Sequence, residues 1–378
     1  MTKMTDFLAR AGALHAESIV VDGHADTPQR FADEAFDWLS ADLRGGQLSA
    51  ATAQAGGLHG EFLALWAEPA QWAGHFVERT YALLDAVDAQ VAQHPQALAR
   101  CTSAAEVRRA RQDGRFAALL GIEGGHSIAN DLDLLRDFFA RGVRYMTLTW
   151  SNTNDWCDSS GDVPRHNGLS AFGQEVLAEM NRLGMLVDVS HVSDAAFWQA
   201  LEASRAPVIA SHSSTRALTD SYRNLTDEML RAIAAQDGVV MVNFNAAFID
   251  ETHRLQWNAL HDERIAAEEQ MCATWHARGQ RMPYRAELEL AHTFLDRAPR
   301  PPLSSLVDHF EHVLRVCGTE HVGIGSDFDG IPAAPAGMDS AADLPKITAG
   351  LLERGWKPHE LRGMLGENIL RVLDHAHA

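Results

Sequence analysis

The chain has few cysteines and no long apolar run, and each shortage excludes a class of protein. Its four cysteines, Cys101, Cys157, Cys272 and Cys317, lie far apart and form no Cys-x-x-Cys pair, so neither a disulfide framework nor a thiolate zinc site is expected. No stretch approaches the ~18 consecutive apolar residues of a transmembrane helix. Residues 1–17 are amphipathic and lack the apolar core of a signal peptide. We therefore expect a soluble, cytoplasmic protein that does not bind membranes.

Positive charge is also scarce. The chain has 32 lysines and arginines against 51 aspartates and glutamates, which gives a formal net charge of -19. Phosphate backbones and anionic lipids repel such a chain, so nucleic acid is not expected as a partner. The acidic residues are spread along the sequence rather than gathered in a tail, which indicates a solvated surface.

The sequence does contain a regular alternation of short apolar runs with helical stretches, which is typical of parallel strands joined by crossover helices. Eight runs read as strands, at residues 19–26, 61–66, 116–122, 143–150, 185–190, 207–211, 238–244 and 321–326. The length of 378 residues would suit one α/β barrel or two domains. Eight units favour a single (β/α)₈ TIM-type barrel domain that spans residues 1–378. An open dinucleotide-binding sheet is disfavoured because no G-x-G-x-x-G motif follows the first strand. Residues 250–300 are charged, alanine-rich and helical in pattern, which predicts an insertion after the seventh strand.

Metal-binding and acid–base side chains follow five of the predicted strands. Because the carboxyl ends of barrel strands open on one mouth, these side chains are expected to converge there. A single histidine at a strand end is more often structural, and a lone glutamate before Gly-Gly is more often a turn residue. Six such groups on one rim nevertheless predict a metal site. They are His24, Asp26, Glu123, His191, His212 and Asp327.

The number of candidate ligands exceeds what one tetrahedral catalytic zinc ion requires. A carboxylate that bridges two ions resolves the excess, and Glu123 is the natural bridge because Asp26 pairs with His24. One Zn²⁺ would take His24, Asp26 and Glu123, and the other would take Glu123, His191 and His212. Two ions about 3.5–4 Å apart can share a hydroxide and polarise a substrate oxygen.

Asp327 is left over once the five ligands are assigned. It suits a general base and acid that takes a proton during attack and passes it to the leaving amine. The alternatives for Asp327 are a sixth metal ligand or a turn carboxylate.

These residues lie in segments that resemble the membrane dipeptidase (renal dipeptidase) family of zinc peptidases, within the amidohydrolase superfamily. The resemblance implies a binuclear zinc (β/α)₈ barrel that cleaves dipeptides, commonly as a homodimer, with the five zinc ligands named above. The matching segments run through most of the chain, at 22–26 (DGHAD), 121–128 (GIEGGHSI), 188–193 (DVSHVS), 211–214 (SHSS), 223–224 (RN), 240–244 (VMVNF), 323–330 (GIGSDFDG) and 366–373 (GENILRVL).

The family pattern also carries substrate-binding residues. It implies that Arg223 grips the C-terminal carboxylate of the substrate, for which a guanidinium offers a bidentate fork. The alternative for Arg223 is a surface arginine on a polar loop. Bacterial members often accept a D-residue at the C-terminal position, and the resemblance implies the same here.

One position departs from the family pattern. Well-known members carry, after the fourth strand, a histidine that contacts the substrate and steadies the developing oxyanion, and this chain has Trp150 there. An indole N–H donates one hydrogen bond but neither accepts one nor becomes cationic. Trp150 therefore either donates to the substrate, shapes an apolar pocket, or leaves the role to Asn152 or Asn154.

The sequence thus predicts a zinc-dependent dipeptidase. A second hypothesis is an amidohydrolase that uses the same metal site on N-acyl amino acids, lactams or other amides. A third is a metal-binding protein without activity, which Trp150 keeps open, although Asp327 argues against it because a structural site needs no spare acid. The ligand types also suit Mn, Co or Fe.

Overall fold

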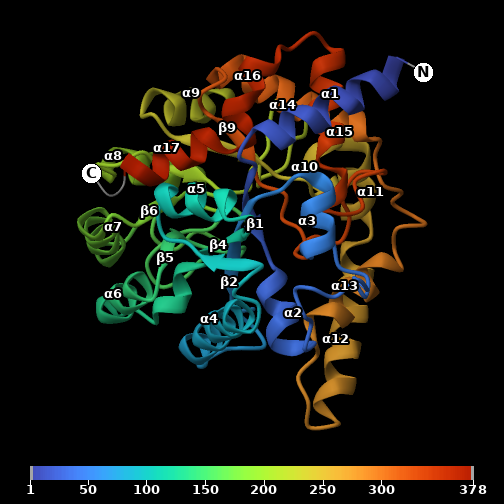
Figure 1. Cartoon of the computed structure of the whole chain (residues 1–378). Helices are drawn as coiled ribbons and strands as arrows, with labels where there is room; N and C mark the ends of the chain where they lie inside the picture. Colours follow the sequence, from blue (N-terminus) through green and yellow to red (C-terminus); the bar gives the residue numbers. More distant parts are fainter. Residues whose placement is uncertain (1–2, 376–378) are drawn as a thin grey trace.

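The structure is a computed structural model that describes residues 3–375 of the chain. Eight parallel strands form a closed barrel, and helices surround it (Figure 1). Neighbouring strands of the ring pair in parallel, and the first of them along the chain pairs with the last to close the ring. The predicted (β/α)₈ TIM-type barrel is confirmed. Its strands are β1 (Val21–Ala25), β2 (Gly60–Trp66), β4 (Phe116–Glu123), β5 (Val143–Thr147), β6 (Leu186–Asp188), β7 (Ile209–Ala210), β8 (Val239–Val242) and β9 (Val322–Ile324).

One further strand, β3 (Leu98–Arg100), lies outside the closed ring and was not predicted. It pairs in parallel with Phe116–Ala118, the first residues of β4. The pairing between β4 and β5 begins at Leu120, so the start of β4 is open on that side. A three-residue strand fills this gap, and it is too short to leave a periodic pattern in the sequence.

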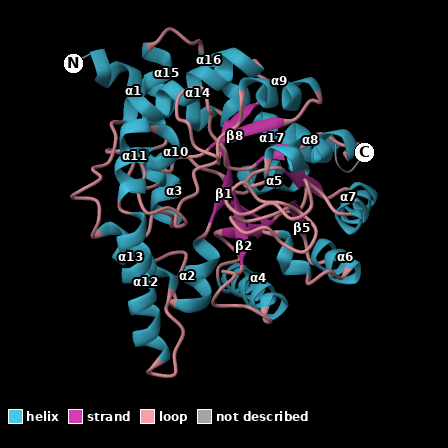
Figure 2. Ribbon diagram, turned by 180° about the vertical axis from the view of Figure 1, so that it is seen from behind, coloured by secondary structure: helices cyan, strands magenta, loops and turns pink. Residues whose placement is uncertain are grey.

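Helices cover the outside of the barrel, as Figure 2 shows from behind. Many begin at a side-chain cap, which satisfies a free backbone N–H of the first turn. Ser170, Ser193 and Thr226, for example, accept hydrogen bonds from backbone N–H groups three residues later. The surrounding helices include α4 (Phe76–Gln93), α5 (Ala104–Gln112), α6 (Leu132–Ala140), α7 (Ala171–Leu183), α8 (Asp194–Ala203), α9 (Asp227–Ala235), α14 (Leu303–Cys317), α15 (Pro345–Glu353) and α17 (Asn368–His375).

The last helical segment of the chain is interrupted. The structure has α16 (Pro358–Arg362), a π-helical turn η3 (Gly363–Glu367) and then α17. Gly366 leaves helical geometry, and a Cβ atom there would lie 2.5 Å from the carbonyl oxygen of Ile19. The close approach of the chain just before β1 therefore requires a glycine at this point.

Near the N-terminus the structure has three helices, α1 (Lys3–Glu17), α2 (Thr27–Asp33) and α3 (Ala50–Gly56). The sequence did not predict α2 and α3. Asp26 precedes α2 as its N-terminal flanking residue, so the first strand ends at Ala25 and does not include Asp26 as predicted. Pro28 in the first turn favours the helix at this point, because its fixed φ suits a helix start.

The insertion after β8 is helical. It contains α11 (Glu251–Ala259), α12 (His261–His276) and α13 (Tyr284–His292), and α12 projects away from the barrel (Figure 1). Trp257, Leu260 and Phe294 belong to a small apolar cluster that is separate from the barrel core. Among residues 3–375, no helix combines the length and the apolar character needed to cross a membrane.

Candidate metal centre

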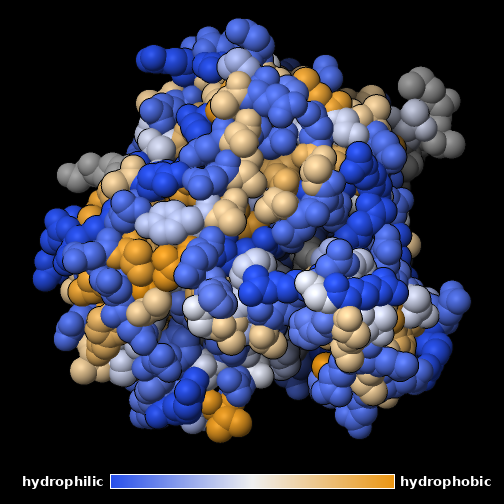
Figure 3. Space-filling model, turned by 90° about the horizontal axis from the view of Figure 1, so that it is seen from below, coloured by the Kyte–Doolittle hydropathy of each residue, from blue (hydrophilic) through white to orange (hydrophobic). Residues whose placement is uncertain are grey.

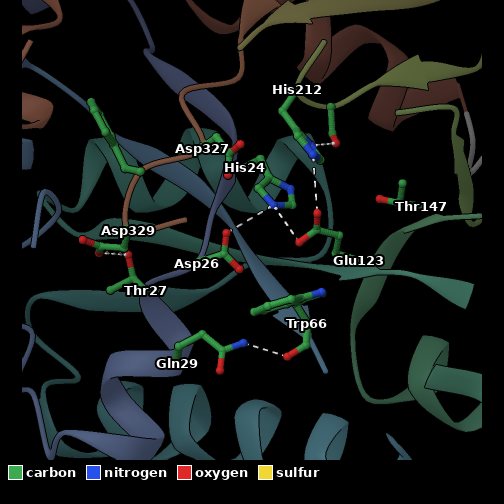
Figure 4. A network of polar contacts seen from close by, with 12 residues as sticks. His24, Asp26, Thr27, Gln29, Trp66, Glu123, Thr147, His212, Asp327 and Asp329 are labelled. Carbon is green, nitrogen blue, oxygen red and sulfur yellow. Dashed lines mark hydrogen bonds and ion pairs between the residues drawn. The ribbon is translucent and has the colours of Figure 1, made fainter. Parts of the chain in front are cut away.

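The six rim residues predicted from the sequence lie together at the carboxyl end of the barrel. Figure 4 shows His24, Asp26, Glu123, His212 and Asp327 gathered in one network. All six residues are buried, with at most 9% of their surface exposed. His24 lies in β1 and Glu123 ends β4, whereas Asp26, His191, His212 and Asp327 stand in the loops that follow β1, β6, β7 and β9.

Glu123 lies at the centre of this group. Its Oε2 atom is 3.3 Å from Nε2 of His24. Its Oε1 atom is 2.9 Å from Nε2 of His191 and 3.5 Å from Nε2 of His212. The two oxygens of one carboxylate therefore face different imidazoles, which is the arrangement a bridging ligand requires.

His24 belongs to two groups of potential ligand atoms. In the first, atoms of His24, Glu123 and His212 lie within 4.8 Å of one another. In the second, the same holds for His24, Asp26 and Asp327. Nε2 of His24 is 3.6 Å from Oδ2 of Asp26.

The electrostatics favour metal-binding forms of several of these side chains. Burial, with the charge of Arg223 as the next cause, lowers the pKa of His191 to about 3. Burial likewise holds the pKa of His212 well below its ordinary value. Burial alone would raise the pKa of Glu123, but the imidazoles, His24 first, hold it well below its usual range. Neutral imidazoles and an ionised carboxylate are the forms that bind a metal.

His24 differs from the other two histidines. Burial would lower its pKa, but Tyr145, Glu123 and Asp26 together raise that pKa well above its ordinary value. The carboxylates thus attract positive charge to Nε2 of His24. Within residues 3–375, Nε2 of His24 and Oδ1 of Asp26 are buried and make no hydrogen bond. A divalent cation would satisfy both atoms, so the residues present fit a metal.

The backbone is strained at two of the rim residues. His191 has φ 69° and Asp327 has φ 62°, in the left-handed region that non-glycine residues rarely adopt. Such conformations cost on the order of 1–3 kcal/mol each and concentrate at functional sites. Here they occur in the loops that place the two side chains in the mouth.

Asp327 is held by Asn243, which follows β8 directly. Nδ2 of Asn243 donates to Oδ2 of Asp327 at 2.9 Å and to the carbonyl oxygen of His212 at 3.2 Å. Burial raises the pKa of Asp327, and Glu123 raises it further, against the opposing effect of His24. No role was predicted for Asn243, although it is a polar residue that follows an apolar run, as the three histidines do.

A cavity of about 160 Å³ opens beside these residues, and its wall includes Asp26, Glu123, His191 and Asp327. Arg223 also lines it and is only 4% exposed, so the alternative of a surface arginine is wrong. Its Nη2 donates to the carbonyl oxygen of His212 at 3.3 Å. Its Nη1 is buried without a hydrogen-bond partner in the described part of the chain.

Trp150 forms an aromatic wall of the cavity. Its ring lies 4.9 Å from the ring of Trp66 and 6.4 Å from that of His191. The side chain of Asn154 makes its hydrogen bonds within its own loop. It donates to the carbonyl oxygen of Leu148 and accepts from the backbone N–H groups of Trp156 and Cys157. The cavity wall includes Ser151 rather than Asn152.

The sequence missed further residues of this wall. Tyr222 and Phe248 add aromatic surface, and Glu287 reaches the cavity from α13 of the insertion. Burial first, and then the nearby carboxyls of Glu268 and Glu68, raise the pKa of Glu287 to about 8. Glu287 lies far from any predicted strand end, so strand-end reasoning could not find it.

Buried imidazoles and carboxylates at the carboxyl mouth of a (β/α)₈ barrel, beside a cavity of about 160 Å³, are typical of a metallohydrolase. Comparison with known proteins gives the family. Residues 8–378 match the model of the membrane dipeptidase family (peptidase family M19), and the chain belongs to this family. It is thus a metallo-dipeptidase by family, a hydrolase that acts on peptide bonds.

Individual relatives agree with this assignment. Human Dipeptidase 3 is 31% identical over 379 residues, which are 98% of this chain and 67% of that protein. The probable dipeptidase PvdM from Pseudomonas aeruginosa has a similar structure, with a TM-score of 0.84, 26% identity and 98% coverage of each chain. A metallo peptidase from Rhodobacter sphaeroides, solved with a phosphinate mimic of the dipeptide L-Ala-D-Ala, gives a TM-score of 0.75 at 26% identity and covers 95% of this chain and 99% of its own.

Proposed function

We propose that the chain is a binuclear zinc dipeptidase whose ligands are His24, Asp26, Glu123, His191 and His212. Glu123 carries the proposal, because its Oε2 faces His24 while its Oε1 faces His191 and His212. One ion would be held by His24, Asp26 and Glu123, and the other by Glu123 and the remaining two histidines. When bound, the ions would activate water and polarise the peptide carbonyl.

Asp327 is the proton carrier in this proposal. Its raised pKa and its position on the cavity wall suit a group that takes a proton from the attacking water and donates it to the leaving amine. Asn243 orients the carboxylate by a hydrogen bond to Oδ2, which leaves Oδ1 for the reacting atoms.

Arg223 binds the C-terminal carboxylate of the dipeptide. Its buried Nη1 has no hydrogen-bond partner among the described residues and lies at the cavity, so an incoming carboxylate would satisfy it. The similarity to the Rhodobacter sphaeroides metallo peptidase, bound to a mimic of L-Ala-D-Ala, supports tolerance of a D-residue at this end of the substrate. Trp150 would then pack against the substrate as an apolar wall.

The direct test is hydrolysis of a stereochemically mixed dipeptide library by the zinc-loaded protein, with a panel of N-acyl amino acids in parallel. The expected result is cleavage of dipeptides that chelation abolishes and that requires a free α-amino group. Cleavage of the N-acyl amino acids in preference to dipeptides would instead favour the amidohydrolase alternative. The homodimer and the cytoplasmic location stay predictions, which sedimentation and cell fractionation would test.

A further inference from the structure

We propose that Asp188, acting through the hydroxyl group of Ser211, fixes His212 in the tautomer that leaves Nε2 free for a metal ion. Asp188 and Ser211 are positioning residues in this proposal, since neither lies on the cavity wall. The inference rests on the proposed metal site and assigns a role to two residues outside it.

Asp188 ends β6 and is fully buried. Its Oδ1 accepts hydrogen bonds from the backbone N–H groups of Ser190 at 3.0 Å and Ser211 at 2.9 Å. Its Oδ2 accepts from the hydroxyl groups of Thr147 and Ser211, each at 2.5 Å. Four donors on two oxygens match an ionised carboxylate, which only accepts hydrogen bonds.

The hydroxyl group of Ser211 has a single proton, which it donates in a hydrogen bond to the carboxylate of Asp188. Oγ of Ser211 also lies 2.7 Å from Nδ1 of His212. Because Oγ has already donated its proton, it must accept here, so Nδ1 of His212 carries the hydrogen. A neutral imidazole has one N–H, and Nε2 therefore presents its lone pair.

That lone pair lies where the site needs it. Nε2 of His212 is 3.5 Å from Oε1 of Glu123 and 2.8 Å from Nε2 of His191. The opposite tautomer would place a hydrogen between these atoms and would block the metal position. The hydrogen bonds from His212 to Ser211 and from Ser211 to Asp188 thus fix Nε2 as the metal-binding atom. Hydrogen bonds to the second nitrogen of a metal-binding histidine generally have this effect.

A second hydroxyl group does the same for His24. The Tyr145 hydroxyl donates to the carbonyl oxygen of Gly23 at 3.1 Å and lies 2.8 Å from Nδ1 of His24. It must therefore accept from Nδ1, so in the neutral, metal-binding form of His24 the lone pair is on Nε2. A Cβ atom at Gly121 would lie 2.1 Å from the Tyr145 ring, so a glycine at this point of β4 makes room for the tyrosine.

The test compares Asp188→Asn with Thr147→Val in zinc-binding titrations against a chromophoric chelator. The asparagine amide would donate to Ser211 where the carboxylate accepted. The freed Ser211 hydroxyl would then donate a hydrogen bond to Nδ1 of His212, which places the imidazole hydrogen on Nε2. We expect zinc affinity to fall by about 10- to 100-fold. Thr147→Val removes another hydrogen bond to the same carboxylate oxygen, but the Ser211 hydroxyl still donates to Asp188. This variant should therefore bind zinc like the wild type.

NMR of metal-free protein labelled with ¹⁵N-histidine reads the tautomer directly. The His212 resonances are identified as those missing from the spectrum of His212→Asn. The wild type should carry the hydrogen on Nδ1, and Asp188→Asn should move it to Nε2. If Asp188→Asn does not fold, Ser211→Ala decides, because it removes the acceptor of Nδ1–H and should weaken zinc binding in the same way.

Three results would overturn the proposal. The first is wild-type zinc affinity in both Asp188→Asn and Ser211→Ala, which would leave the metal site standing. The second is an equal loss of affinity in Thr147→Val, which would make Asp188 a structural link between strands. The third is a wild-type protein that binds no zinc, which would also overturn the proposed function.

Discussion

Two aspartates that stand two residues apart after β9 have different surroundings. Asp327 faces the cavity and receives one hydrogen bond from Asn243. Asp329 accepts from the hydroxyl of Thr27 at 2.7 Å and from the backbone N–H of Gln47 at 2.6 Å. The same residue type therefore has a proposed chemical role at one position and at the other joins the start of α2 to the loop before α3, and only the three-dimensional contacts distinguish them.

We expect Asp327→Asn to lower kcat by about 10²- to 10⁴-fold, the range typical of a lost proton carrier. Bound metal should stay at the wild-type level, because the five proposed ligands are intact. Steady-state kinetics together with metal analysis of the purified variant measure both. Near-normal turnover would contradict the proton role, and loss of a metal would identify Asp327 as a sixth ligand. Asp329→Asn is the matched control, which should lower Tm while kcat is kept.

Arg223→Lys should lower kcat/KM for dipeptides by about 10- to 100-fold, or 1.4–2.8 kcal/mol. A lysine keeps the charge but loses the bidentate fork that matches a carboxylate. The measurement compares each dipeptide with its C-terminal amide in wild type and variant. The wild type should discriminate strongly between the two and the variant weakly. Unchanged discrimination would show that another group binds the carboxylate.

At the scale of elements, the insertion contributes to the site as well as to the outer surface. Glu287 on α13 lines the metal-site cavity, and it also lines an adjoining cavity of about 480 Å³ whose wall includes Trp257 on α11 and Glu268 on α12. The two cavities share Trp150 and Tyr222 as well. The insertion therefore forms the outer part of the space that continues from the metal site.

The carboxyl of Glu287 should make stability depend on pH. Folding raises its pKa from 4.5 to about 8, first by burial and then by nearby carboxyls, so the folded state binds the proton more tightly than the unfolded chain. The associated stability is fully present below the unfolded pKa and is lost as the pH rises toward 8. The side chain in Glu287→Gln is neutral at every pH. The free energy of unfolding of this variant, relative to that of the wild type, should therefore increase from pH 5 to pH 8.

Urea unfolding of both proteins across this pH range measures the effect. Glu353→Gln, at an exposed position of α15, controls for the loss of one negative charge. A difference between Glu287→Gln and wild type that does not change with pH would contradict the raised pKa.

At the scale of the whole molecule, the barrel could be predicted because each of its eight strands is a distinct apolar run. The rim residues followed, because the ends of parallel strands must meet. The short elements could not be predicted, since β3, α2 and α3 have too few residues for a periodic pattern. Tyr145 lies inside an apolar run, and its contact with His24 depends on how the strands face each other.

The surface agrees with the composition. Figure 3, which views the molecule from below, shows a face made mostly of hydrophilic residues, with hydrophobic residues in separate groups. This matches a chain in which 22% of the residues are charged and are spread along the sequence. The sequence could not predict the wall contributed by Glu287, because an insertion carries no strand-end signal.

The central claim is that two metal ions bridged by Glu123 make the chain an active dipeptidase. The most direct measurement titrates Zn²⁺ into the metal-free protein and follows bound metal and dipeptide hydrolysis in the same samples. The account predicts two ions per chain, with full activity only when both are bound, and loss of one or both ions in Glu123→Gln. Saturation at one ion per chain with full activity, or wild-type binding by Glu123→Gln, would contradict it.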